Sequence, residues 1–158
     1  MKFRHEYKHY INRSHYYILK SRLETIMKPD RNVNAEGKYI IRSLYFDNIY
    51  DKALREKIDG VNNREKFRFR YYNDDTSFIR LENKIKINNL CNKQSVKVSK
   101  EQVQKIIDGD YEWMNTTEEK LLLELYSKIK GQLLMTKIIV EYIREPYTME
   151  AGNVRITI

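Results

Sequence analysis

Basic side chains recur at every second position in one short segment of the chain. Lys66, Arg68 and Arg70 fall on one side of it, while Phe67 and Phe69 fall on the other. Such alternation is typical of a β-strand, in which successive side chains point to opposite faces. Arginine binds phosphate oxygens through paired hydrogen bonds, and lysine supplies a mobile positive charge. A strand face of this kind is therefore suited to binding a chain of phosphates.

The same pattern returns in the two segments that follow, 78–87 and 93–98. The basic residues that share a face there are Arg80, Lys84, Lys86, Lys93 and Lys97. A solvated sheet surface is one interpretation of such a face. However, like charges on neighbouring strands repel, at a cost of roughly 0.2–1 kcal/mol per direct pair. The concentration of cations therefore favours a sheet that curls around a bound polyanion.

Two glutamates interrupt these basic faces. Glu6 precedes Lys8 by two residues, and Glu82 precedes Lys84 in the same way. Each carboxylate could orient its lysine or bind a divalent metal carried by the phosphates, because such metals take one or two carboxylates from the protein. The alternative is a simple ion pair that relieves repulsion. The ion pair is the favoured interpretation for Glu82, whereas for Glu6 the two interpretations balance.

The elements that must position these residues alternate between strands and helices. Strands are expected over 2–11, 39–47, 64–72, 78–87, 93–98, 133–144 and 154–158. Helices are expected between Ser14 and Pro29, over 49–58, from the capping box of Ser99 and Gln102 to Asp108, and from Thr116 to Gly131. Turns fit at 73–75 and 88–89. Consecutive antiparallel strands with inserted helices predict an α+β fold, in which the helices cover the apolar strand faces.

Composition limits the classes of partner. The chain has 158 residues with 30 Lys+Arg against 22 Asp+Glu, a net charge of +8, which indicates an anionic partner. Most tyrosines fall on apolar faces, which argues against nucleic acid, and no glycine-rich phosphate loop is present. The single Cys91 excludes an internal disulfide framework. With no signal peptide or transmembrane stretch, we expect one cytoplasmic domain over 1–158.

Seven short motifs in sequence order resemble the vacuolar transporter chaperone (VTC) polyphosphate polymerase domains, of the CYTH-like triphosphate tunnel metalloenzyme group. They are RHEYKHY at 4–10, SLYFDN at 43–48, FRFRY at 67–71, LENK at 81–84, KQSVK at 93–97, VEYIR at 140–144 and VRI at 154–156. No single motif is specific, because Arg-x-Arg on a strand is common. The ordered set covers nearly the whole chain and is fairly specific.

The resemblance implies a closed antiparallel tunnel of about eight strands with helices packed outside. Such domains transfer the γ-phosphate of ATP to a polyphosphate chain with Mn²⁺ or Mg²⁺. The implied catalytic residues are Lys8, Arg68, Arg70 and Lys84. Further phosphate contacts are indicated by the alternation at Lys66 and Lys97, and the resemblance implies contacts at Lys97, Tyr142, Arg144 and Arg155. For Arg144 the resemblance alone supports the assignment, because Ile138, Val140 and Tyr142 share its face. Glu6 and Glu82 are the candidate metal ligands.

The resemblance also has departures. Family members continue beyond the last residue here into a further strand whose glutamate binds metal, so we expect a truncated domain and leave its own activity open. A non-catalytic module that binds polyphosphate or inositol phosphates is one alternative. A triphosphate hydrolase is another, although hydrolases of the group carry Glu-x-Glu-x-Lys where this chain begins the motif with Arg4. Any membrane-protein partner is not visible in the sequence.

Overall fold

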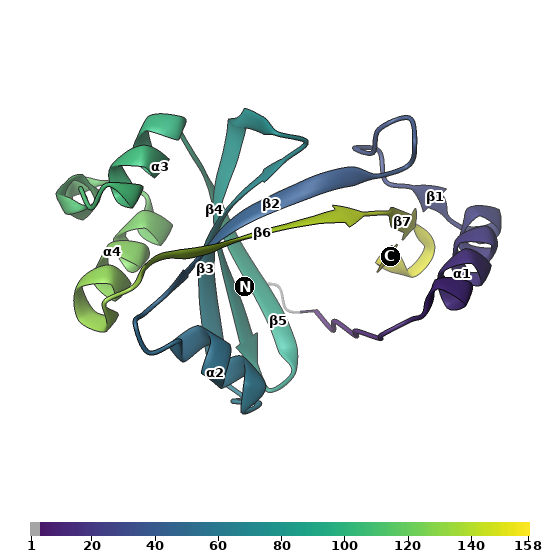
Figure 1. The fold of residues 1–158 in the computed structure, drawn as a ribbon, viewed down its shortest axis with the longest axis horizontal. Helices are drawn as coiled ribbons and strands as arrows, with labels where there is room; N and C mark the ends of the chain where they lie inside the picture. The colour runs from purple at the N-terminus through teal and green to yellow at the C-terminus, as the bar shows by residue number, and fades with distance from the viewer. Residues whose placement is uncertain (1–3) are drawn as a thin grey trace. The chain divides into compact units, whose positions relative to one another are not determined.

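The computed structural model describes residues 4–158, which form an α+β fold with four α-helices and two antiparallel sheets (Figure 1). The predicted fold class is therefore confirmed. Contacts within the chain group it into two compact units. Unit 1 comprises the described residues up to Glu6 together with Arg42–Val140, and unit 2 comprises Tyr7–Ile41 and Glu141–Ile158. The closed tunnel that the family resemblance implies stays a prediction.

One sheet has five strands in the order β5-β4-β3-β2-β6. Their bounds are Tyr39–Asp47 for β2, Arg64–Tyr72 for β3, Asp75–Ile87 for β4, Leu90–Val98 for β5 and Met135–Arg144 for β6. Strands were expected at all five positions. The two tight turns use residues with positive φ, at Asn73 and Asp74 and again at Asn88 and Asn89. Positive φ at both central residues suits a two-residue hairpin, so β4 begins earlier than predicted, inside the expected three-residue turn.

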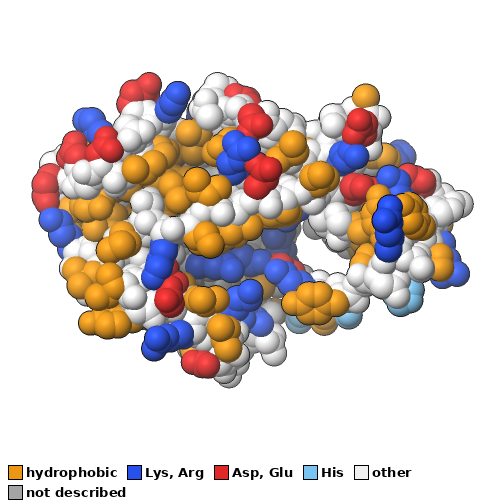
Figure 2. Space-filling model, in the orientation of Figure 1, with side chains coloured by type: hydrophobic (Ala, Val, Ile, Leu, Met, Phe, Trp, Pro, Cys, Tyr) orange, Lys and Arg blue, Asp and Glu red, His pale blue; other side chains and the backbone are white. Residues whose placement is uncertain are grey.

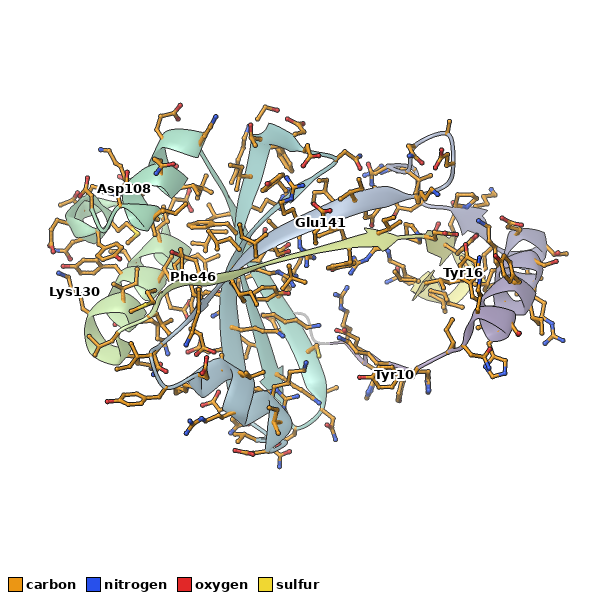
Figure 3. The ribbon with its side chains drawn as sticks, viewed as in Figure 1. Tyr10, Tyr16, Phe46, Asp108, Lys130 and Glu141 are labelled. Atoms are coloured by element: carbon orange, nitrogen blue, oxygen red, sulfur yellow. The ribbon has the colours of Figure 1, made fainter. Side chains whose placement is uncertain are left out.

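The apolar face of this sheet forms the larger core. It packs against α3 (Lys100–Ile107), the 3₁₀ helix η1 (Glu112–Thr116) and α4 (Lys120–Gln132). The buried members of this core include Phe46, Phe67, Phe69, Leu81, Ile106, Met114, Leu122 and Leu125. Phe46 points toward these helices (Figure 3). The opposite face of β3, β4 and β5 is thereby left to the charged side chains, as the alternation predicted.

The helix ends correct the sequence-based boundaries in two places. The first helix, α1 (Arg13–Ile26), is capped by Asn12, whose Oδ1 accepts a hydrogen bond from the His15 amide at 2.8 Å, and not by Ser14. Thr116 belongs to η1 rather than to the start of α4, which begins at Lys120. The capping box of Ser99 and Gln102 at α3 is confirmed in both directions. The short helix α2 (Lys52–Ile58) also forms where one was expected.

Unit 2 contains α1 and a small sheet in the order β1-β7-β8. Its strands are β1 (Lys28–Pro29), β7 (Pro146–Met149) and β8 (Val154–Thr157). A small core of Leu23, Met27 and Tyr147 joins the helix to the sheet. The sequence did not predict β1 and β7, because two to four residues carry too little alternation to be recognised.

The strand predicted over 2–11 is wrong for the residues that the structure describes. Arg4 forms an isolated bridge with Cys91, with both backbone hydrogen bonds at 3.0 Å, and residues 5–12 form no strand. Residues 1–3 lie outside the described residues. Alternation alone does not make a strand, because a strand also needs a neighbour to share its backbone hydrogen bonds. Among the described helices, none is both long enough and apolar enough to cross a membrane.

Candidate functional site

The register between β3, β4 and β5 arranges the charged side chains in three rows across the sheet. The first row is Lys66, Lys84 and Lys93. The middle row is Arg68, Glu82 and Ser95. The last row is Arg70, Arg80 and Lys97. We call these three rows the cationic face. Side chains within a row are about 4.8 Å apart and successive rows about 6.6 Å apart, as set by sheet geometry.

Glu82 lies at the centre of the cationic face and is only 1% exposed. Arg68 donates to its Oε2 from both Nε, at 2.9 Å, and Nη2, at 2.7 Å. Lys93 Nζ donates to Oε1 at 2.9 Å, and Nη1 of Arg70 lies 3.8 Å from Oε2. Burial by itself raises the pKa of the Glu82 carboxyl, but these three cations outweigh it and hold the pKa below its ordinary value. The carboxylate is the internal counter-ion of the face.

Two residues of β2 hold the arginines from the other side. Arg68 Nη1 donates to Tyr45 Oη at 2.8 Å, and Arg70 Nε donates to Ser43 Oγ at 3.1 Å. Ser43 and Tyr45 lie in the SLYFDN motif at 43–48 but were not among the predicted site residues. A signal was present, because period-two alternation puts both on the face of β2 opposite the core residue Phe46.

The outer cations have weaker attachments. Lys84 pairs with Glu6, and Arg80 Nη1 donates to Ser95 Oγ at 3.1 Å. The charged groups of Arg80 and Lys97 lie 4.9 and 5.4 Å from the centre of the Phe78 ring. These groups can turn toward a ligand without breaking a buried ion pair.

Lys66 shows that the positive charges of the cationic face repel one another. Burial lowers the pKa of its ammonium group, and the positive charges of Lys84 and Arg68 lower it further. A bound anion would oppose these effects and favour the charged form. Figure 2 shows Lys and Arg side chains gathered in a recess of the part of the molecule that holds β3, β4 and β5.

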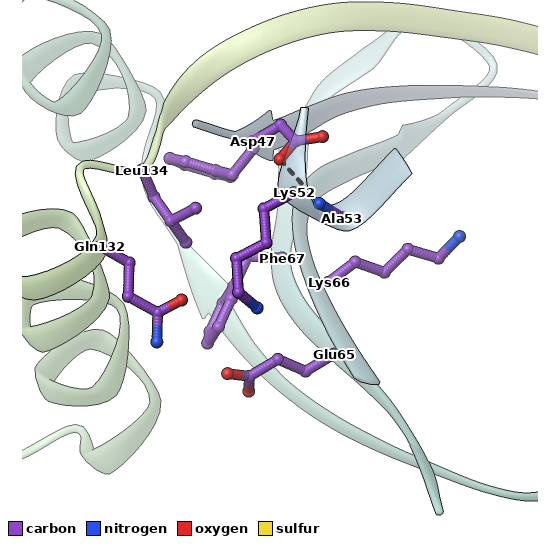
Figure 4. Close-up of a pocket in the computed structure, with 9 residues that line it drawn as sticks. Asp47, Lys52, Ala53, Glu65, Lys66, Phe67, Gln132 and Leu134 are labelled. Atoms are coloured by element: carbon purple, nitrogen blue, oxygen red, sulfur yellow. Dashed lines mark hydrogen bonds between the residues drawn. The ribbon is translucent and has the colours of Figure 1, made fainter. Parts of the chain in front are cut away.

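A close-up of the sheet near α2 shows that neighbouring side chains of β3 point to opposite faces of the sheet. Lys66 points to one side of the strand, whereas Glu65 and Phe67 point to the other, into a small pocket (Figure 4). Asp47 lies at this pocket and accepts hydrogen bonds from the amides of Ala53, at 2.9 Å, and Leu54, at 3.2 Å. These bonds anchor the start of α2 at the end of β2.

The structure brings together seven of the residues predicted to be catalytic, phosphate-binding or metal-binding. Unit 1 holds Lys66, Arg68, Arg70, Glu82, Lys84, Lys97 and Glu6. The other four, Lys8, Tyr142, Arg144 and Arg155, belong to unit 2. Within unit 2, Arg144 Nη2 donates to Tyr142 Oη at 2.9 Å. Arg155 donates to Tyr39 Oη at 2.8 Å and pairs with Asp30 at 3.0 Å.

The two candidate metal ligands differ in how well they fit a cation. Both oxygens of Glu82 accept hydrogen bonds from cationic groups, whose positive charge opposes the approach of a metal ion, so Glu82 as a metal ligand stays a prediction. The side chain of Glu6 is 28% exposed and pairs with Lys84, so it fits as one carboxylate ligand of a metal carried by phosphates. Between residues 4 and 158, no cluster of three or more His, Cys, Asp or Glu side chains could hold a metal ion.

Comparison with known protein families supports the resemblance seen in the motifs. The family model of the VTC domain matches residues 3–158, nearly the whole chain. No curated protein matches the chain.

Proposed function

Because the chain belongs to the VTC domain family, which is associated with polyphosphate synthesis, we propose that its cationic face binds the phosphates of ATP and of inorganic polyphosphate. This proposal rests on the arrangement of the three rows of the cationic face. Seven cations share the face with a single buried carboxylate. Such an excess of positive charge, fixed on one rigid sheet, attracts an extended polyanion.

The proposed reaction is transfer of the γ-phosphate of ATP to the end of a polyphosphate chain. Phosphoryl transfer needs little covalent chemistry from the protein, so positioning and neutralisation of charge supply most of the catalysis. The proposed phosphate contacts of unit 1 are Lys66, Arg68, Arg70, Arg80, Lys84, Lys93 and Lys97, and Glu82 keeps Arg68 and Arg70 oriented. Lys8, Tyr142, Arg144 and Arg155 are proposed contacts from unit 2.

A divalent Mn²⁺ or Mg²⁺ ion, when bound, would neutralise charge on the transferring phosphates. Glu6 is the residue proposed to hold it, together with phosphate oxygens. The family's closed tunnel is part of the proposal, because exclusion of water strengthens electrostatic contacts with the transferring phosphate.

A non-catalytic module that binds polyphosphate is the second candidate. The observation that favours it is that residues 4–158 contain no group of three or more His, Cys, Asp or Glu side chains that could hold a metal ion. Binding of tripolyphosphate without any growth of polyphosphate from ATP and Mn²⁺ would distinguish this function from polymerisation.

The first test is calorimetric titration with tripolyphosphate. The double variant Arg80→Ala/Lys97→Ala removes two outer cations and leaves the buried ion pairs intact. We expect it to bind at least about tenfold more weakly, since hydrogen bonds to charged groups contribute roughly 1.5–3 kcal/mol each. Lys105→Ala/Lys130→Ala, on α3 and α4, removes the same charge and is the matched control. Equal affinity of the first variant and the wild type would contradict the proposal.

A further inference from the structure

Tyr45 lies on β2 among three basic side chains of β3. The Lys66 Nζ atom is 5.5 Å from the centre of its ring, and the guanidinium carbon of Arg68 is 5.6 Å from it. Arg70 is close enough for its charge to act on the phenol. The side chain is half-buried. Because these three cations lie near it, its hydroxyl has a strongly positive surrounding.

The hydroxyl of Tyr45 accepts a hydrogen bond but, among the described residues, does not donate one. Arg68 Nη1 donates to Oη at 2.8 Å, and a guanidinium has no acceptor that could take a proton in return. Throughout residues 4–158, no acceptor receives a hydrogen bond from Tyr45 Oη. The other nitrogens of Arg68 are held by Glu82. Arg68 therefore holds the phenol oxygen in place, and the phenol proton has no acceptor among residues 4–158.

An anionic oxygen is the acceptor that this surrounding favours, because the nearby cations attract negative charge while the hydroxyl supplies the hydrogen bond. We propose that Tyr45 donates a hydrogen bond to a phosphate oxygen of the bound polyanion, and that Arg68 holds the hydroxyl in position. This inference rests on the proposed function and adds to it a binding role for Tyr45, which lies in the SLYFDN motif at 43–48 but was not among the candidate site residues.

Ionisation of the phenol supplies a second readout. Burial raises the pKa of Tyr45, but Arg68, Lys66 and Arg70 outweigh burial and lower the pKa below its ordinary value of 10. Above that pKa the group loses its donor and repels phosphate. The charged groups that face it are these three cations of β3 and, through Arg68, Glu82 of β4. Lys66 also loses charge at high pH, so only a difference between variants isolates the phenol.

The test compares Tyr45→Phe with the wild type by titration with tripolyphosphate from pH 7 to pH 10. Phenylalanine keeps the ring and removes the hydroxyl. At pH 7 we expect binding weakened by about tenfold or more. With rising pH the two affinities should converge, because the wild type loses its donor as the phenol ionises. Loss of a hydroxyl that only accepted a hydrogen bond from Arg68 would not produce this convergence.

Tyr71→Phe is the matched control. Arg42 Nη1 donates to Tyr71 Oη at 3.1 Å, and its guanidinium lies 5.7 Å from the ring centre, but Tyr71 packs against the core. We expect it to bind tripolyphosphate as the wild type does.

The possible failures are distinct. Wild-type affinity in Tyr45→Phe, or weaker affinity with parallel pH curves, would overturn the role of Tyr45 and leave the proposed function standing. A folded wild type that ignores tripolyphosphate would overturn both.

Discussion

At the scale of single residues, Glu82 illustrates how a charged side chain can be buried in a sheet. Its carboxylate is almost inaccessible to water, and three cationic side chains surround it. Removing one partner of such a group is far more costly than the net contribution of the pair, because the remaining charges stay buried and unpaired. The positive charge of the same contacts opposes the approach of a metal ion.

We predict that Glu82→Ala lowers the free energy of unfolding by about 3–5 kcal/mol, since it leaves Arg68 without its principal partner. Urea denaturation followed by circular dichroism measures the change. Glu112→Gln is the control, because that glutamate lies at the surface and pairs with the exposed Lys130. A loss below about 1 kcal/mol in Glu82→Ala would show that the network contributes little to folding.

The pH dependence of this effect has a definite sign. The folded-state pKa of Glu82 lies below its ordinary value of 4.5, so its ionisation stabilises the fold above that pH. This stabilisation is lost as the pH falls below 4.5 toward the folded-state pKa. Glu82→Gln cannot ionise, so its free energy of unfolding should decline less steeply than that of the wild type over the same acidic range.

At the scale of elements, caps decide where the helices begin. Ser99 Oγ accepts from the Gln102 amide at 3.1 Å, and the Gln102 side chain accepts from the Ser99 amide at 2.8 Å. This reciprocal pair directly follows β5, so it fixes the point at which the chain leaves the sheet to form α3. The helix can then place Ile106 in the larger core.

We predict that Ser99→Ala lowers stability by about 1 kcal/mol, the usual effect of losing an N-cap. Thermal unfolding by differential scanning calorimetry detects such a change. Ser127→Ala, at an exposed position inside α4, should leave stability unchanged or slightly raised, because alanine favours the helix interior. A Ser99→Ala variant as stable as the wild type would mean that α3 is held by packing alone.

At the scale of the whole molecule, the two units differ in the size of their cores. The core of unit 1 combines one face of the large sheet with α3 and α4, whereas that of unit 2 is built from Leu23, Met27 and Tyr147. Burial of apolar surface is the main stabilising contribution to folding, so local opening requires less free energy where the core is small.

Hydrogen–deuterium exchange followed by mass spectrometry should reveal this difference. We expect amides of α1 to exchange faster than amides of β3 and β4, which belong to the larger sheet. The comparison needs correction for the intrinsic exchange rate of each peptide. Equal protection of the two segments would show that the units open together.

The sequence by itself determined the strands that carry the cationic face. Alternation in 64–72, 78–87 and 93–98 predicted strands in all three segments, and the charged residues share a face as expected. Period-two patterning is a local property, so it can be recognised without knowledge of the neighbouring strands. The α+β class and the VTC domain family were recognised from the sequence as well.

Only the tertiary structure decided which partners these residues meet. Glu82 was paired in sequence with Lys84, yet in the sheet it contacts Arg68 and Lys93, because the register of β4 with its neighbouring strands sets which side chains meet. The alternating segment 2–11 formed no strand over residues 5–11, since alternation by itself does not supply the cross-strand hydrogen bonds that define a strand. Local pattern predicts the direction of a side chain, whereas its contacts depend on cross-strand neighbours.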